Sequence, residues 1–266
     1  MIALAALIIV TMGCDKIDDP LKPFTPQAGT KTVLVKDFTG VRCNNCPGAA
    51  EIVHQLQHQL GEDRVMIMSV HAGSLANPGT VFPDFRTDEG TAWYNSNMSN
   101  PLFSVDHVAL TEGNTYYVNQ IDAPVSEALS EEQTFDINIV NVYDETTRLL
   151  NVENQITPLR DGQGQYYATV CLVEDSITGW QMVPTSTEHP EGVDTTYVFR
   201  NVFRRTLNGA DGVLVVNGNY YPDDVFITTN EIVLDSNYNA DQCYILTYVY
   251  NKLDGKILQT ALNKIK

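Results

Sequence analysis

The N-terminal part of the chain has the hydrophobic pattern of a strand, a helix and a second strand. Residues 32–35 form a short apolar run, which predicts a buried strand. Apolar residues then recur at helical spacing from Pro47 to Leu60, and Gly61 ends that pattern. Residues 65–70 are a continuous apolar run of strand length, typical of the middle of a sheet. This order predicts a β–α–β unit.

The pattern is less regular between residues 72 and 132. A short helix is predicted around residues 88–94, and a strand opened by a proline at 101–106. Residues 116–129 have helical character, but Pro124 must kink or split the helix there.

The hydrophobic pattern changes after residue 132, from helical spacing to strand-like alternation. Phe135, Ile137 and Ile139 alternate with polar residues, and residues 166–173 and 243–250 are rich in Val, Ile and Tyr. Asp-Gly and Asn-Gly turn signals separate these segments, which favours a β-sandwich. The expected domains are therefore 31–132 and 133–266, joined near Gln133, because the two patterns cannot easily share one regular sheet.

The first residues read as a targeting segment. Residues 1–14 are an apolar run that ends in Gly13-Cys14, which resembles a bacterial lipoprotein signal with Cys14 as the lipidated residue. A clipped ordinary signal peptide is the alternative. Residues 15–30 hold three prolines and are interpreted as a linker. Their acidic cluster at Asp18-Asp19 resembles the surface-export signal of Bacteroidetes lipoproteins, and a simple solvated tether is compatible with it.

The net charge of the chain limits the kinds of partner it can bind. The chain has 33 acidic and 16 basic residues and a formal net charge of -17, which argues against nucleic-acid binding. No apolar run approaches the length of a membrane-spanning helix. An exported chain can keep disulfides, and pairing of Cys171 with Cys243 is left open.

The chemistry of the chain is concentrated at Cys43 and Cys46, which follow the first strand and open the predicted helix. A helix N-terminus stabilises a thiolate, and the positive charge of Arg42 adds to this. Cys43 is therefore expected to be the exposed attacking thiolate and Cys46 its buried partner. The alternative is a short structural disulfide.

Asp37 and four histidines are the other candidate residues for this chemistry. Asp37 follows three apolar residues and a lysine, so burial would raise its pKa and suit it to proton transfer; an exposed strand-end carboxylate is the alternative. His54 and His58 fall on the polar side of the helix and are expected to be solvated. His71 and His107 end predicted strands, where they would bind a soft metal only if they met the cysteines.

Residues 35–46, from the first strand to the second cysteine, resemble the thioredoxin pattern of strand, turn and CxxC. The resemblance places Asp37 where thioredoxins keep a buried proton-transferring aspartate, and Pro101 where they keep a cis-proline that faces the cysteines. Thr39 and Arg42 stand where tryptophans are usual, and Asn44-Asn45 where Gly-Pro is usual.

A second resemblance spans nearly the whole chain. The stretches that carry it are Asp37-Phe38-Thr39-Gly40 with the CxxC-Pro, Ser69-Val70-His71-Ala72-Gly73, and Phe203-Arg204-Arg205-Thr206-Leu207-Asn208-Gly209. They are similar to the 28-kilodalton outer-membrane lipoproteins of Bacteroidetes. That resemblance implies a thioredoxin-like domain followed by an immunoglobulin-like domain, with adhesin-like surface roles suggested for the family. Asp106-His107 replaces the Asn-Arg expected there, beside the site.

The sequence therefore predicts an α/β domain followed by an all-β domain, in an outer-membrane protein anchored through lipid at Cys14. The cell surface is the expected location, with the periplasmic face as the alternative. One functional hypothesis is thiol–disulfide exchange or redox sensing, hence a thiol–disulfide oxidoreductase, at Cys43, Cys46, Asp37 and Pro101. The other is a surface binding or adhesin module with a structural disulfide. The partner is an unidentified protein or dithiol substrate, and neither hypothesis calls for a cofactor or metal.

Overall fold

The computed structural model describes residue 29 and residues 31–94 and 97–266. The expected lipidation site Cys14 and the Asp18-Asp19 cluster lie outside the described residues. None of the helices that are described is long and apolar enough to cross a membrane.

The predicted β–α–β unit is present. Strand β1 (Val33–Thr39) runs parallel to β2 (Val65–His71), and helix α1 (Cys46–Leu60) connects them. Strand β3 (Leu102–Val105) pairs antiparallel with the other edge of β1. Every residue of β1 is buried because β1 lies between two strands and is covered on both faces, which explains its lack of alternation.

The remaining helices are short. Helix α2 (Asp88–Trp93) begins at Thr87, whose side chain accepts a hydrogen bond from the Gly90 N–H. The predicted helix over residues 116–129 is split into the 3₁₀ turn η2 (Val118–Gln120) and helix α3 (Asp122–Ser130). Pro124 lies in the first turn of α3, where its missing N–H leaves no hydrogen bond unmade. Two more 3₁₀ turns are η1 (Ser74–Ala76) and η3 (Ala240–Gln242).

The second half of the chain consists mainly of strands. They are β4 (Phe135–Asp144), β5 (Leu149–Pro158), β6 (Gly162–Glu174), β7 (Ile177–Met182), β8 (Val193–Phe199), β9 (Val202–Thr206), β10 (Val213–Tyr220), β11 (Phe226–Val233), β12 (Cys243–Asn251) and β13 (Ile257–Lys264). Strands β11, β5 and β4 form a three-stranded sheet, and β7 and β8 a two-stranded one. The three-stranded sheet packs its apolar face on β6, β10 and β12, so two sheets enclose one core.

The two halves share a sheet. Its order is β13-β12-β6-β9-β2-β1-β3, with β10 also paired to β6, and Ser69 of β2 pairs with Val202 of β9. The expectation that the two patterns would avoid one common sheet is therefore wrong, because β9 runs along the free edge of β2. Each half also has a core of its own, while a further core mixes residues of both. Separate folding of 31–132 and 133–266 stays a prediction.

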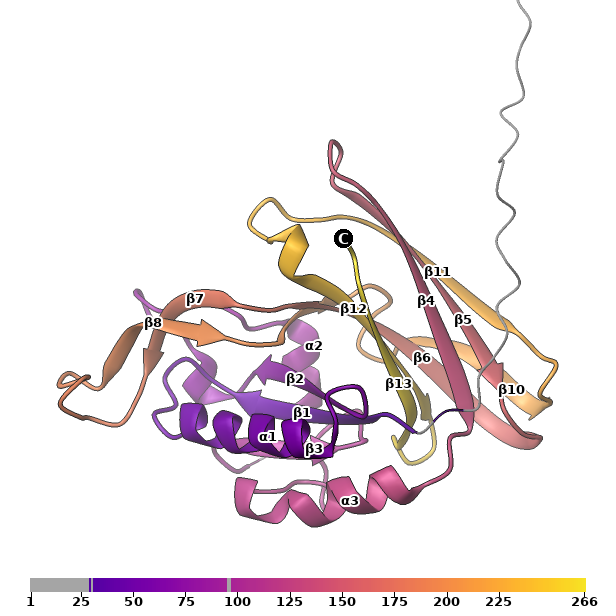
Figure 1. The fold of residues 1–266 in the computed structure, drawn as a ribbon, viewed down its shortest axis with the longest axis horizontal. Helices are drawn as coiled ribbons and strands as arrows, with labels where there is room; N and C mark the ends of the chain where they lie inside the picture. Colours follow the sequence, from indigo (N-terminus) through magenta and orange to yellow (C-terminus); the bar gives the residue numbers. More distant parts are fainter. Residues whose placement is uncertain (1–28, 30, 95–96) are drawn as a thin grey trace, which may run out of the picture.

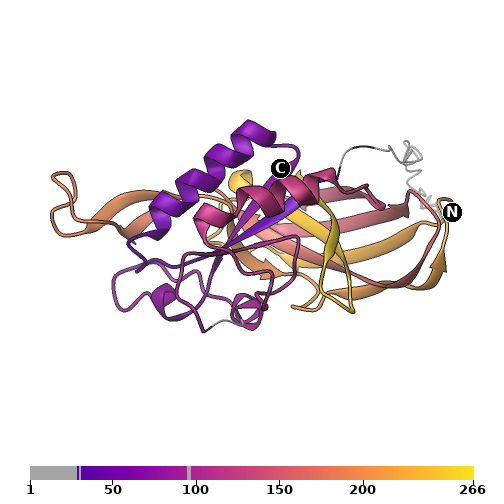
Figure 2. The same cartoon turned by 90° about the horizontal axis from the view of Figure 1, so that it is seen from below.

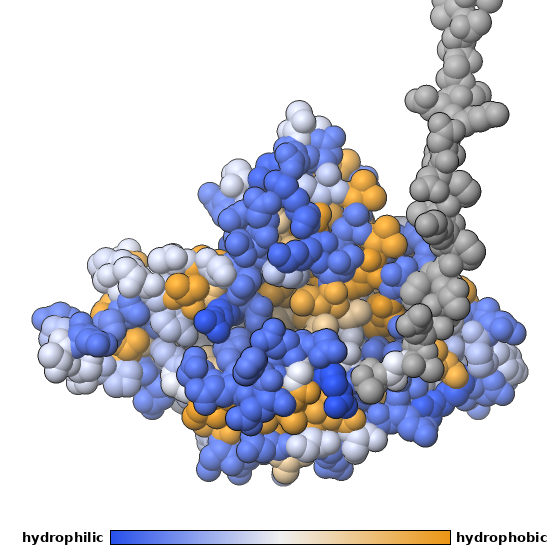
Figure 3. Space-filling view, in the orientation of Figure 1, coloured by the Kyte–Doolittle hydropathy of each residue, from blue (hydrophilic) through white to orange (hydrophobic). Residues whose placement is uncertain are grey.

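The helices and the β7–β8 hairpin are placed asymmetrically. Helices α1 and α3 pack against β1, β2 and β3, and both lie on the same side of the sheet (Figures 1 and 2). The β7–β8 hairpin extends away from the rest of the molecule beyond the amino end of α1. On the face seen in Figure 3, hydrophilic side chains predominate and apolar ones form several separate groups, in keeping with the strongly acidic composition.

Candidate functional site

The cysteines lie where the sequence predicts them, in the turn between β1 and α1. Cys43 and Cys46 form a disulfide, and α1 begins at Cys46 with Pro47 in its first turn. The turn packs closely on residues 75–76, since a side chain at Gly40 would meet the Leu75 carbonyl group at 2.5 Å. Glycine is therefore required at position 40, and the turn is held rigidly at the carboxyl end of β1.

Cys43 does not have the exposure expected of it. Its exposed fraction is 2%, against 3% for Cys46, so both cysteines are buried. The cover comes from β7, because the Gln181 side-chain amide donates to the carbonyl oxygens of Cys43, at 3.0 Å, and of Gly40, at 3.3 Å. The Met182 N–H also donates to the Val41 carbonyl oxygen at 2.9 Å. The β7–β8 hairpin thus closes over the cysteine turn.

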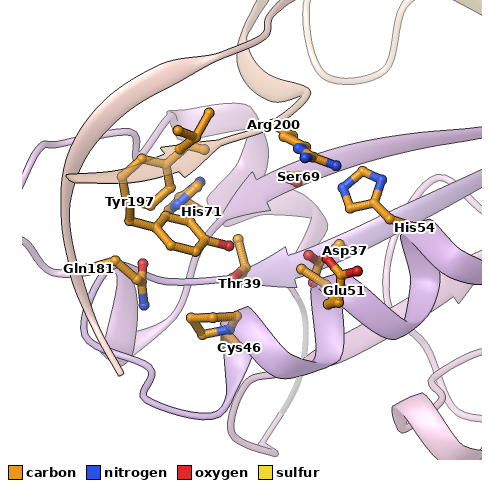
Figure 4. A pocket seen from close by; sticks show the side chains of 14 residues that line it. Asp37, Thr39, Cys46, Glu51, His54, Ser69, His71, Gln181, Tyr197 and Arg200 are labelled. Atoms are coloured by element: carbon orange, nitrogen blue, oxygen red, sulfur yellow. The ribbon is translucent and has the colours of Figure 1, made fainter. Parts of the chain in front are cut away.

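A pocket of about 250 Å³ opens beside the pair. Cys46, Ala50 and His54 line it from one face of α1, at the four-residue spacing that brings side chains together on a helix. The opposite wall comes from Tyr197 to Arg200, in and just after β8. Figure 4 shows these side chains converging on the carboxyl ends of β1 and β2.

Asp37 lies on the floor of this pocket. It is buried, and within the described residues its Oδ1 atom has no hydrogen-bond partner. Burial raises the pKa of the Asp37 carboxyl to about 7. The expected burial of Asp37 is thus found, and its carboxyl can take up or release a proton near neutral pH.

His71, at the end of β2, lines the same pocket. Its ring is buried between Phe85 and Phe199, with ring centroids 4.9 and 5.7 Å away. Neither ring nitrogen has a hydrogen-bond partner among the described residues. Burial, helped by the charge of Arg204, lowers the pKa of His71 to about 3, so the imidazole is neutral at physiological pH.

Three ionisable side chains surround the upper part of the pocket. Glu51 and Arg200 are exposed, and His54 lies between them (Figure 4). His54 was expected on a solvated face, but it is partly buried, and burial lowers its pKa. His58 is exposed, as expected. Ile52 belongs to the apolar pattern predicted for residues 47–60 and was expected to be buried, but it is exposed. Burial and the nearby Asp37 raise the pKa of Tyr197 to about 12, which keeps this phenol protonated.

Pro101 lies at the same end of β1. The Asn100–Pro101 bond is cis, as the thioredoxin resemblance implies. The Asn100 side-chain amide donates to the carbonyl oxygens of Thr39 and Ala72, both at 2.8 Å. This pair of hydrogen bonds ties the segment before β3 to the ends of β1 and β2.

Asp106-His107 does not lie beside the cysteines, and that expectation is wrong. Because β3 runs antiparallel to β1, its last residues reach the amino end of β1. The Asp106 carboxylate accepts a hydrogen bond from the Leu34 N–H at 2.7 Å and pairs with Lys31 at 2.8 Å. From Leu34 to the end of β1 is about 17 Å at the usual rise of a strand.

Sequence reasoning missed the residues that come from the second half of the chain. Gln181, Tyr197 and Arg200 contribute to the site, but Gln181 is 138 positions from the Cys43 carbonyl group that it binds. No local motif marks them, and only pairing of β9 with β2 brings the β7–β8 hairpin to this edge. The free cysteines Cys171 and Cys243 are both buried, elsewhere in the fold.

No cluster of three or more His, Cys, Asp or Glu side chains is arranged to hold a metal ion in the part of the chain that the structure describes. His71 pairs with Thr39 at the carboxyl end of β1, whereas His107 follows β3 near the amino end of β1. The conditional soft-metal site with both histidines is therefore not assembled.

Comparison with known proteins gives a fold relationship. No family model and no curated protein sequence matches this chain. The solved structure of HBP35 of Porphyromonas gingivalis is similar, with a TM-score of 0.65, 14% sequence identity, and 89% of this chain and 76% of that chain covered. A domain of the outer membrane lipoprotein Omp28 from Porphyromonas gingivalis gives a TM-score of 0.31 at 18% identity, over 50% of this chain and 88% of that one. The first similarity shows a shared fold, and the second is too low to support a structural argument.

Proposed function

We propose that this chain is an exported, lipid-anchored protein that exchanges disulfides at Cys43–Cys46. One observation carries the proposal: the disulfide and the buried Asp37 carboxyl, whose Oδ1 has no partner among the described residues, meet in one pocket at the carboxyl end of β1. An uncompensated buried carboxyl costs stability, and such groups are concentrated at functional sites. A proton donor and acceptor beside a dithiol is what thiol–disulfide exchange requires.

The fold is compatible with this proposal. Parallel β1 and β2, the connecting α1, and β3 preceded by a cis-proline follow the thioredoxin-like arrangement proposed for residues 31–132. The two facing sheets after residue 133 are compatible with an immunoglobulin-like sandwich. The sequence stretches that resemble the 28-kilodalton outer-membrane lipoproteins of Bacteroidetes extend the proposal to that family and to the outer membrane.

The exchange can be written for a substrate disulfide. One thiolate of the reduced pair attacks the substrate disulfide, the substrate's S–S bond breaks, and a mixed disulfide forms. The second protein thiolate then attacks the protein sulfur of that mixed disulfide, which restores the Cys43–Cys46 bond and releases the second substrate thiolate. Two electrons pass from the protein dithiol to the substrate. Asp37 takes the proton of the resolving thiol.

The test is insulin reduction by the full-length chain with dithiothreitol as reductant. The wild type should accelerate the reaction, and Cys43→Ser should abolish the acceleration. Cys171→Ser is the matched control, because Cys171 is a free, buried cysteine outside the pocket. Asp37→Asn should slow exchange about 100-fold at neutral pH. No acceleration by the wild type, together with a less stable Cys43→Ser variant, would leave the disulfide as a structural cross-link in a surface binding module.

The anchoring part has its own test. Cys14→Ser should release the protein from membranes, because the acyl chains on this cysteine would supply the anchor. Protease treatment of intact cells should digest the wild type and spare an Asp18→Ala/Asp19→Ala variant if the acidic cluster directs surface export. Equal digestion of both would reduce the cluster to a tether.

A further inference from the structure

The pocket beside the disulfide contains polar groups that the protein leaves unused. Asp37 and His71 are each about 2% exposed. One carboxylate oxygen of Asp37 and both ring nitrogens of His71 have no partner among the described residues, and both side chains line the same pocket. Buried polar atoms are almost always hydrogen-bonded. Three such atoms around one pocket therefore indicate a site that a polar ligand completes.

The mouth of the pocket has charges of both signs that do not neutralise each other. Glu51 projects from α1, and Arg200 follows β8 on the facing wall (Figure 4). In the described part of the chain they form no ion pair with each other, and Glu51 accepts only from the Gln55 amide, at 3.2 Å. A guanidinium binds a carboxylate through two parallel hydrogen bonds, and a carboxylate binds an ammonium group. The mouth is therefore complementary to a ligand that has both groups.

The size of the pocket limits that ligand. Its volume of about 250 Å³ is below the range of roughly 300–1,000 Å³ of pockets for drug-sized molecules. The β7–β8 hairpin covers the cysteine turn through Gln181 and Met182. Cys46 lines the pocket, whereas Cys43 does not. Of the two cysteines, Cys46 is therefore the one next to a small molecule in the pocket, while a folded protein would have to displace the hairpin.

We propose that this pocket binds the zwitterionic head group of a small amino-acid thiol or disulfide, of the cysteine and cystine class. Arg200 holds the carboxylate, Glu51 and Asp37 face the ammonium group, and the ligand sulfur lies toward Cys46. This proposal names a substrate class for the exchange proposed above, and its sulfur chemistry rests on that exchange. Binding of the head group does not depend on that exchange.

The sulfur step balances with two ligand thiols. The thiolate of a first cysteine attacks Sγ of Cys46, the Cys43–Cys46 bond breaks, and Cys43 leaves as a thiolate. A second cysteine thiolate attacks the ligand sulfur of the mixed disulfide, so that cystine leaves and Cys46 becomes a thiolate. The protons of the two ligand thiols end on Cys43 and Cys46. Two ligand thiols are oxidised to one disulfide, and one protein disulfide is reduced.

Binding is tested with matched ligands on the oxidised full-length chain by isothermal titration calorimetry. The probes are L-cystine, S-methyl-L-cysteine, cystamine, which lacks the carboxylates, and 3,3′-dithiodipropionate, which lacks the ammonium groups. Cystine and the unreactive S-methyl-L-cysteine should bind. The two truncated disulfides should bind at least about tenfold more weakly than cystine, the ratio that loss of about 1.4 kcal/mol produces. No binding of cystine or S-methyl-L-cysteine, or equal binding of all three disulfides, would overturn the proposal.

Variants assign the two charges. Arg200→Gln should remove the preference for cystine over cystamine, and Glu51→Gln the preference over dithiodipropionate. Arg205→Gln and Glu62→Gln are controls, because both residues are exposed and neither lines the pocket. Unchanged preferences in the Arg200 and Glu51 variants would overturn the proposed assignment, whatever the controls do.

A trapping experiment identifies the sulfur. With Cys43→Ser, the free Cys46 thiolate should attack cystine, release one cysteine and retain the other as a mixed disulfide visible by mass spectrometry. Cys46→Ser should trap little. The opposite pattern would overturn the place given to Cys46. Insulin reduction without cystine binding overturns the small-ligand proposal and leaves the exchange intact, whereas binding without any exchange supports the head-group site and removes the proposed function.

Discussion

Asp37 and Asp106 are two buried aspartates, each 2% exposed, that lie at different ends of β1. The carboxylate of Asp106 has a backbone N–H partner and an ion pair with Lys31, which in turn contacts Glu131. Burial would lower the pKa of Lys31, but the carboxylates of Asp106 and Glu131 outweigh burial and raise it. The Oδ1 atom of Asp37 has no partner in the described residues, and a pocket lies beside it.

The difference separates a structural carboxylate from a chemical one. Burial raises the pKa of Asp106 too, but its carboxylate keeps the Leu34 N–H and the Lys31 ammonium as partners, so it joins β1, β3 and the end of α3. The burial of Asp37 is uncompensated, so its proton affinity is raised where a disulfide and a pocket meet. Asp106 also lines a pocket, but one away from the disulfide. Asp37 differs because, among the described residues, its Oδ1 has neither a hydrogen bond nor an ion pair, and because its pocket contains Cys46 of the disulfide.

The largest expected effect is the loss of stability when the Asp106–Lys31 pair, near the amino end of β1, is broken. Asp106→Ala should lower the free energy of unfolding by about 3 kcal/mol or more, because it leaves Lys31 buried with one partner fewer. Urea titration measures this. Asp106→Asn should lose less, since asparagine tolerates the positive φ of this residue and keeps the acceptor for the Leu34 N–H.

The control for that change is Asp84→Ala. Asp84 is exposed and pairs with Arg86, so its removal should cost no more than about 1 kcal/mol. Equal losses at positions 84 and 106 would contradict the structural role given to the Asp106 pair.

The second effect is a pH-dependent change in stability caused by Asp37, near the carboxyl end of β1. The pKa of Asp37 is about 7 in the folded chain, against the ordinary 3.8. The folded state binds the proton more tightly, so the stabilising contribution is fully present below pH 3.8 and is lost as pH rises through 7. The stability of Asp37→Asn relative to the wild type should therefore increase by about 2–3 kcal/mol between pH 5 and pH 8.

Thermal denaturation across pH 5 to 8, on the oxidised protein, checks this window. Asp161→Asn serves as the matched control, because Asp161 is exposed. A constant difference between Asp37→Asn and the wild type across the window would show that Asp37 titrates normally in the folded chain.

The smallest expected effect is at Lys36, and it tests whether a buried ionisable group outside the pocket also affects disulfide exchange. Lys36, next to Asp37, is fully buried; its Nζ atom donates to the Val108 carbonyl at 2.7 Å and lies 4.0 Å from the Trp93 ring centroid. Burial lowers the pKa of Lys36 to about 7. The unfolded chain binds the extra proton between pH 7 and 10.5, so stability rises with pH there.

Lys36→Met should stabilise the chain by about 1 kcal/mol at pH 6, and its stability relative to the wild type should fall as pH rises from 7 toward 10.5. Insulin reduction should be unchanged, because Lys36 does not line the pocket. Lys264→Met, at an exposed position, is the control and should show no such pH dependence. A Lys36→Met variant that loses exchange activity would mean that the pocket is not what distinguishes Asp37.

The sequence by itself determined the local features: the β–α–β order, the cysteine turn at the start of α1, and the burial of Asp37 after an apolar run. These follow from patterns within a few residues of each other, because side-chain periodicity and helix caps act locally. The exposure of Cys43, the position of Asp106, and the contributions of Gln181, Tyr197 and Arg200 were decided only by the tertiary structure. They depend on the antiparallel direction of β3 and on the pairing of β9 with β2. Strand direction and long-range pairing are set by the packing of the whole core, which no local pattern encodes.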